Sequence, residues 1–256
     1  LGAVLGPSLA LALLAVFDNQ IRPVLWIAVI PGVLSALTVM FVRDAEVRPR
    51  KASVPPAEKV GLDQPVRQRN QLSRSVKRAI AFLALFSLVN FPDALILLHL
   101  SQEGMSITLV VALYLLFNIS YAALSFPAGM LADRIKPQQV YALGLGCFAI
   151  AYLGLGLTNN LLLETVLVIV YGGFAACNDT VGKSWVAKLA PASEQLAAQS
   201  YLQGLSGFSV LIAGAWAGLL WGIGAGLGTF PLMLSGAIAV VVAAAMLVMR
   251  LRTETD

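Results

Sequence analysis

The sequence predicts an all-α fold, a polytopic bundle of about eight transmembrane helices. Only 12% of its residues are charged, about half the fraction typical of soluble domains, and its mean hydropathy is +0.83. The charges are clustered, because residues 23–42, 107–132 and 195–249 contain no Asp, Glu, Lys or Arg. A bilayer core requires about 20 apolar residues per helix, so uncharged segments of this length indicate membrane spans.

Polar and glycine-rich segments divide the apolar sequence into eight predicted spans. The spans cover residues 1–17, 23–42, 79–100, 107–132, 140–157, 161–182, 200–223 and 229–249. The last boundary follows from "WGIGAGLGTFP", because the uncharged segment around it is too long for one crossing.

A long polar segment, residues 43–78, separates two spans from six. Its prolines and mixed charges are typical of a linker between membrane bundles. When this segment is placed in the cytoplasm and the spans alternate, 16 of the 17 Lys and Arg residues fall on the cytoplasmic side, with Arg22 as the exception. This distribution predicts a multi-pass protein of the plasma (inner) membrane with the linker and the carboxyl terminus cytoplasmic. The net charge of +4 then reflects topology and anionic lipid headgroups rather than a nucleic-acid partner.

One predicted cytoplasmic loop, "PAGMLADRIKPQQV", combines a glycine with a cluster of charges. Gly129 removes a side chain where two helices approach, Asp133 can accept hydrogen bonds at a helix end, and Arg134 offers a planar set of donors. The pattern Gly-x-Leu-Ala-Asp-Arg-x-x-Pro resembles the signature loop of the major facilitator superfamily.

The resemblance extends over essentially the whole chain and implies helices 5 to 12 of that family. Residues 1–42 would then be the last two helices of the amino-terminal bundle, residues 43–78 the cytoplasmic linker, and residues 79–256 the carboxy-terminal six-helix bundle. We expect about four further helices upstream of Leu1. The resemblance also implies a secondary active transporter that moves a small solute by alternating access.

Two interpretations of the charged loop remain. Gly129, Asp133, Arg134 and Lys136 could form a gate that holds the two bundles together in one state and releases them in another. The same residues could also be a plain basic turn that satisfies the positive-inside rule.

Asp93 is the first candidate for coupling or substrate contact. It lies about 15 residues into a predicted span, shares a helix face with Asn90 and follows Pro92. Desolvation without a nearby basic residue favours the protonated carboxyl, which makes Asp93 a candidate proton-binding group. The alternative is a carboxylate near the external water layer that only caps a helix.

Uncharged polar residues form stripes on predicted helices. Tyr114, Asn118 and Tyr121 follow one helix face, and Gln203 and Asn178 are candidates on later spans. Such residues either line a polar cavity or form hydrogen bonds between helices. Asp179 and Lys183, four residues apart, are expected to form a structural ion pair.

The remaining reactive residues do not suggest catalysis. A single histidine, His99, and two separated cysteines, Cys147 and Cys177, offer neither a catalytic constellation nor metal-ligand spacing. We therefore expect no enzyme activity, no cofactor and no metal site. Glu103 and Glu164 lie near predicted external ends and are expected to be solvated.

The expected activity is secondary transport of a solute of unidentified class, by a monomer in the lipid bilayer. Protons are a candidate second substrate, because "GAVLGP" resembles the start of a motif of proton-coupled antiporters, although Leu9 and Ala10 replace its paired glycines. Proton-coupled efflux is thus one form of the expected activity. The alternative is a polytopic membrane receptor or scaffold that does not transport.

Overall fold

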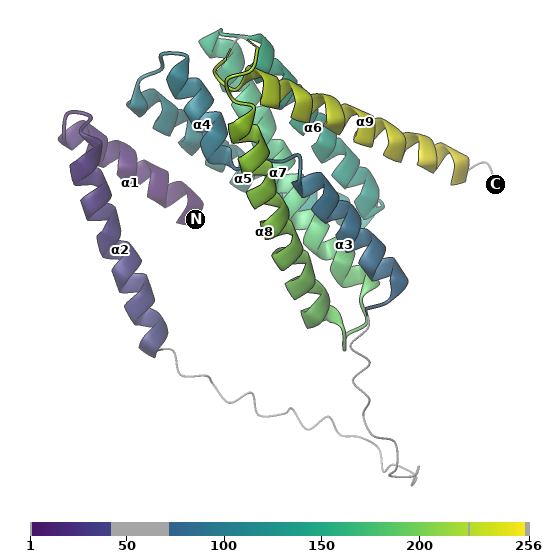
Figure 1. Cartoon of the computed structure of the whole chain (residues 1–256). Helices are drawn as coiled ribbons and strands as arrows, with labels where there is room; N and C mark the ends of the chain where they lie inside the picture. The colour runs from purple at the N-terminus through teal and green to yellow at the C-terminus, as the bar shows by residue number, and fades with distance from the viewer. Residues whose placement is uncertain (1, 42–71, 225, 254–256) are drawn as a thin grey trace. The chain divides into compact units, whose positions relative to one another are not determined.

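The computed structural model describes residues 2–41, 72–224 and 226–253, and every regular element among them is an α-helix. In chain order these are α1 (Gly2–Val16), α2 (Ile21–Phe41), α3 (Arg74–Ser87), α4 (Asp93–Gln102), α5 (Ile107–Arg134), α6 (Pro137–Leu157), α7 (Leu161–Leu189), α8 (Gln195–Leu219) and α9 (Thr229–Thr253), all labelled in Figure 1. The predicted all-α class is confirmed.

The number of continuous spans differs from the prediction. Among the described residues, six helices are long and apolar enough to cross a membrane, namely α2 and α5 to α9. The predicted count of eight was therefore wrong. Helix α1 has 15 residues, and the predicted span 79–100 is divided into α3, with 14 residues, and α4, with 10.

Pro92 explains why the predicted span is broken. Proline lacks the backbone N–H that a helix interior requires, and it disfavours the helical conformation of the residue before it. Pro92 instead has φ −58° and ψ 140° and stands as the residue immediately before α4. Figure 1 shows α3 and α4 as separate helices joined by an irregular segment.

Side chains from later helices satisfy the backbone exposed by this break. The indole Nε1 of Trp216 on α8 donates to the carbonyl oxygen of Leu88 at 2.8 Å, and the Ser235 hydroxyl on α9 donates to that of Val89 at 2.9 Å. Irregular backbone at membrane depth is tolerated where protein groups replace the missing hydrogen bonds. The break between α3 and α4 is therefore stabilised by specific contacts with the rest of the bundle.

Residues 72–253 form a helical bundle with a continuous apolar core. Helix α7 packs between α5 and α6, α9 packs on α6, and α3 packs on α8. Aromatic rings fill the interior: the ring centroids of Phe148 and Tyr152 are 3.9 Å apart, and those of Phe148 and Phe174 are 4.8 Å apart. These rings fix the position of α7, which carries much of the candidate site.

Apart from the break between α3 and α4, the connections between the helices of the bundle gather at two ends. We call the end with residues 103–106, 158–160, 220–224 and 226–228 the His99 end, and the end with residues 135–136 and 190–194 the Asp133 end. Of the predicted linker 43–78, residues 43–71 lie outside the described residues, and Arg74–Arg78 form the first turn of α3.

Candidate functional site

Asp93 is the first residue of α4, directly after the break. Its Oδ1 accepts a 2.6 Å hydrogen bond from the hydroxyl group of Tyr171 on α7. The Tyr171 ring is itself buried and lies 5.1 Å, centroid to centroid, from Phe117 on α5. The carboxylate is thus held by a tyrosine whose own position is set by packing between α5 and α7.

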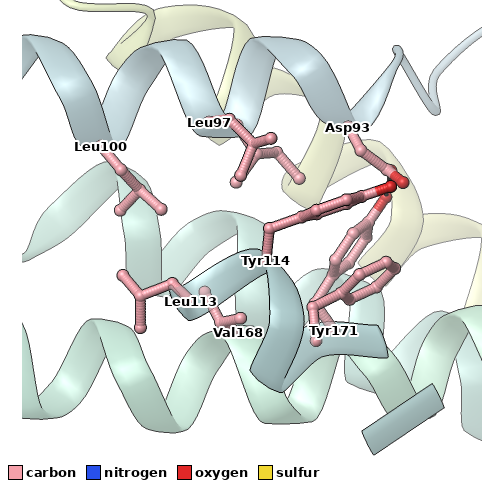
Figure 2. A pocket seen from close by; sticks show the side chains of 9 residues that line it. Asp93, Leu97, Leu100, Leu113, Tyr114, Val168 and Tyr171 are labelled. Carbon is pink, nitrogen blue, oxygen red and sulfur yellow. Dashed lines mark hydrogen bonds between the residues drawn. The ribbon is translucent and has the colours of Figure 1, made fainter. Parts of the chain in front are cut away.

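A small cavity lies beside Asp93. It is lined by Asp93, Ile96, Leu97, Leu100, Leu113, Tyr114, Phe117, Val168 and Tyr171. Figure 2 shows Tyr114 and Tyr171 pointing toward Asp93, with leucines and Val168 around the rest of the space. The cavity volume is about 20 Å³, room for about one water molecule. In this conformation the site is closed to any larger solute.

Asn90 lies on the other side of the break and also faces a tyrosine. The hydroxyl of Tyr152 on α6 donates to its Oδ1 at 3.5 Å, the upper limit of a hydrogen bond. The rings of Tyr152 and Tyr171 are 5.6 Å apart, centroid to centroid. The two residues predicted together, Asp93 and Asn90, are therefore joined through neighbouring tyrosines on α6 and α7.

The predicted polar stripe on α5 does not converge on this cavity. Only Tyr114 lines it. Asn118 is buried, and its Nδ2 donates to the Tyr114 carbonyl oxygen at 2.7 Å within the same helix. Asn178 is half-buried on α7 and Gln203 is exposed on α8.

Tyr121, the last residue of that stripe, pairs with Asp179 across helices. Its hydroxyl donates to Asp179 Oδ2 at 3.1 Å. The predicted ion pair of Asp179 with Lys183 does not occur among the salt bridges of the described residues. The spacing of four residues was sound, but the Asp179 carboxylate is directed toward α5, and the Lys183 side chain is left exposed.

At the Asp133 end the charged loop has a partner that the sequence analysis did not identify. Lys188 Nζ, on the last turn of α7, lies 3.5 Å from Asp133 Oδ1 and donates to the carbonyl oxygen of Ala132 at 3.1 Å. Arg134 and Lys136 are exposed, and Gly129 is half-buried within α5. The described contact of Asp133 is therefore with α7.

Three functional candidates were missed: Tyr171, Tyr152 and Lys188. The two tyrosines stand in uncharged apolar segments, and only the fold brings them to residues 78 and 62 positions away. Lys188 had a usable signal, because a basic residue in the last turn of a helix can reach the carbonyl groups of a neighbouring helix end.

The two carboxyl groups expected to be solvated, those of Glu103 and Glu164, are largely buried instead. The Glu103 side chain is 7% exposed and Glu164 is 0% exposed, and the neighbouring His99 is 1% exposed. His99 lies near the end of α4 and contacts the carbonyl oxygens of Leu155, near the end of α6, and Leu227, in the connection before α9. The expectation of solvation was wrong, since it considered only distance along each span.

The chain is similar to known membrane transport proteins. The family described as Major Facilitator Superfamily matches residues 79–256. An uncharacterized MFS-type transporter of Methanocaldococcus jannaschii is 28% identical over 232 residues, which are 87% of this chain and 55% of that protein. The chain therefore spans about half the length of that relative. No solved structure matches the chain.

Proposed function

The chain belongs to the major facilitator superfamily, and on this premise we propose that the protein is a secondary active transporter that moves a small solute across the membrane by alternating access. We further propose the plasma (inner) membrane as its location, with residues 43–78 and the carboxyl terminus cytoplasmic, because basic residues gather there. We propose that the protein acts as a monomer, with proton-coupled efflux as one form of the transport.

The observation that carries the proposal is the position of Asp93. A carboxyl group inside a membrane bundle is costly and generally serves a pathway for ions or solutes. In many transporters the binding site is formed where a transmembrane helix is discontinuous. Asp93 lies at such a break, beside a cavity, with a tyrosine as its hydrogen-bond donor.

The small size of the cavity suggests how access could change. Its walls belong to three helices: α4 contributes Asp93, α5 contributes Tyr114, and α7 contributes Tyr171. A movement of α4 about the irregular segment would separate Asp93 from Tyr171 and enlarge the cavity. Binding of a proton or a cationic solute at Asp93 would then compete with the tyrosine hydrogen bond.

The contact of Asp133 with Lys188 is the corresponding candidate for the gate. It joins the end of α5 to the end of α7, and both side chains are largely exposed. An exposed pair contributes little to stability, about 0–1 kcal/mol, so it can be exchanged for another partner at small cost. We propose that it is remade each time the Asp133 end opens and closes.

The test is solute-dependent proton movement in proteoliposomes. The full-length protein is reconstituted with a pH-sensitive dye inside, and solutes are added by class: organic cations, organic anions, sugars and amino acids. The proposal expects a pH change with at least one class, and its loss in Asp93→Asn. Asp18→Asn is the matched control, because Asp18 lies in the exposed turn between α1 and α2, where its φ of 48° suits asparagine equally.

Two results would count against the proposal. If the Asp93→Asn variant moves protons as the unchanged protein does, Asp93 has no role in coupling. If no solute class produces flux of protons or of labelled solute in either direction, a receptor or scaffold without transport becomes the better explanation.

A further inference from the structure

The buried histidine at the His99 end makes two contacts that one neutral ring cannot satisfy. His99 Nδ1 lies 2.6 Å from the carbonyl oxygen of Leu227, and Nε2 lies 3.1 Å from that of Leu155. Both partners are acceptors. A neutral imidazole donates from one nitrogen only, whereas the imidazolium donates from both. Only a protonated ring can make both hydrogen bonds at the same time.

The charge on this ring has a counter-ion close by. Glu103 Oε1 lies 3.4 Å from His99 Nε2, with side chains 1% and 7% exposed for His99 and Glu103. The salt bridges among the described residues join neither Glu103 nor Glu164 to a lysine or an arginine. His99 is thus the basic side chain that Glu103 contacts.

Glu164 is the unexplained member of the group. It is 0% exposed, it interacts with Glu103, and neither of its carboxyl oxygens has a hydrogen-bond donor. Glu103 Oε2 is buried without a donor as well. Two ionised carboxylates are acceptors only, so they repel each other and leave these oxygens unsatisfied. One proton between them removes a charge and supplies the missing donor.

A bound metal ion explains these unpaired carboxyl oxygens less well than a shared proton does. Among the residues that the structure describes, no group of three or more His, Cys, Asp or Glu side chains is arranged to hold one. One imidazolium, one carboxylate and one protonated carboxyl give a neutral cluster without any further ligand. A buried cluster of this size is stable only when its charges cancel.

We infer that Glu103 and Glu164 share a proton-binding site at the His99 end, with the His99 imidazolium as its counter-ion. The site is separate from the Asp93 cavity and does not depend on the proposed function. It connects α4, the end of α6, the start of α7 and the glycine-rich connection before α9. That connection adopts a left-handed backbone at Leu227, with φ of 59°, and His99 donates to the carbonyl group of this residue. Loss of the shared proton places an uncompensated negative charge in the cluster.

The first test observes the histidine directly. The full-length protein, purified with a tag that contains no histidine, is labelled with ¹⁵N-histidine, and the His99 signal is identified by its loss in His99→Gln. At neutral pH the expected signal is that of the imidazolium. It should convert to a neutral tautomer in Glu103→Gln, which removes the counter-ion, and persist in Glu164→Gln, which imitates the protonated carboxyl.

The second test observes the shared proton by infrared difference spectroscopy during a pH titration. The carbonyl stretch of a protonated carboxylic acid should lose one component in Glu164→Gln, while Asp93→Asn leaves that component in place. Both variants replace a carboxyl group by an amide group of nearly the same shape, so we expect the fold to be preserved. Either of two results overturns the inference: a neutral His99 ring at neutral pH in the unchanged protein, or an infrared band that is identical with and without Glu164.

Discussion

The hydroxyl group of Tyr171 donates a 2.6 Å hydrogen bond to Asp93, and it thereby links the middle of α7 to the first residue of α4. This link lies where the bundle departs from regular helix, at the irregular segment that Trp216 and Ser235 hold from α8 and α9. Side chains from α7, α8 and α9 therefore meet the chain at or beside this joint. A change at that joint should affect transport before it affects the fold.

Tyr171→Phe is expected to reduce transport without unfolding the protein. The phenylalanine ring keeps the packing against Phe117 but removes the donor to Asp93. A hydrogen bond to a charged group is worth about 1.5–3 kcal/mol, and a proton or cationic solute at Asp93 competes with it, so we expect about a tenfold or larger gain of apparent affinity. Tighter binding slows release and therefore slows turnover. The apparent affinity and the rate of transport are measured from flux in proteoliposomes at a series of solute concentrations and pH values.

Tyr201→Phe is the matched control for this experiment, because Tyr201 is 63% exposed on α8. Its flux should equal that of the unchanged protein. If the two variants have the same flux, the Tyr171 hydrogen bond does not affect binding or transport at the Asp93 site.

Trp216→Phe is expected to destabilise the break between α3 and α4. The variant keeps an aromatic ring near Phe91 but leaves the carbonyl oxygen of Leu88 without its donor. An unsatisfied buried acceptor costs about 1–3 kcal/mol. Thermal unfolding in detergent should show a lower midpoint for this variant. The midpoint should be unchanged in Trp26→Phe, because the Trp26 side chain is 77% exposed. Equal midpoints would mean that water replaces the indole at Leu88.

The sequence predicts the long helices well because the signal for them is local. An uncharged segment bounded by charges places α5 at 107–132, and the structure has Ile107–Arg134. The same reasoning fails at residues 79–100, because the hydropathy of the side chains does not show where the backbone of a helix is interrupted. Pro92 is visible in the sequence, but the break is stable only because Trp216 and Ser235 arrive from more than 120 residues away.

The candidate site is predicted in part for a similar reason. A charged residue in an apolar segment, such as Asp93, stands out in any sequence. Its partner Tyr171 does not, because a tyrosine in a transmembrane helix is ordinary and only tertiary packing directs its hydroxyl group. The burial of Glu164 is also not visible in the sequence, because it depends on how the helices pack around the start of α7.

The pair of Asp133 and Lys188 should act on transport and not on stability. The side chains are 80% and 51% exposed, so Asp133→Asn and Lys188→Gln should each change the free energy of unfolding by less than about 1 kcal/mol. If the contact is part of the gate, each variant slows flux, and the charge exchange Asp133→Lys with Lys188→Asp recovers part of it. A double-mutant cycle on flux measures the coupling between the two side chains.

Lys136→Gln separates this gate from a plain basic turn. Lys136 is exposed in the same loop and carries the same charge. A gate predicts that it has little effect, whereas a turn that only sets orientation predicts that Lys136→Gln and Lys188→Gln are equivalent. Additive effects of the Asp133 and Lys188 variants would also count against the gate.

Gly172→Ala should be more harmful than the same change at the next residue. A Cβ at Gly172 would lie 2.7 Å from the Ser120 Cβ and 3.0 Å from the carbonyl oxygen of Phe117, so α5 and α7 would have to separate. At Gly173 the nearest atom, Leu124 Cδ1, would lie 3.5 Å away, an ordinary contact. Overpacking costs about 1–3 kcal/mol, whereas alanine in an uncrowded helix position stabilises by up to about 1 kcal/mol.

This pair of variants also tests how the site is positioned, because Gly172 directly follows Tyr171. Separation of α5 from α7 would move the tyrosine hydroxyl away from Asp93, so Gly172→Ala should lose flux as well as thermal stability. Gly173→Ala should keep both. A Gly172→Ala variant with an unchanged unfolding midpoint would show that α5 and α7 approach less closely than the contacts of Ser120 and Phe117 require, and the link between helix packing and the Asp93 site would then fail.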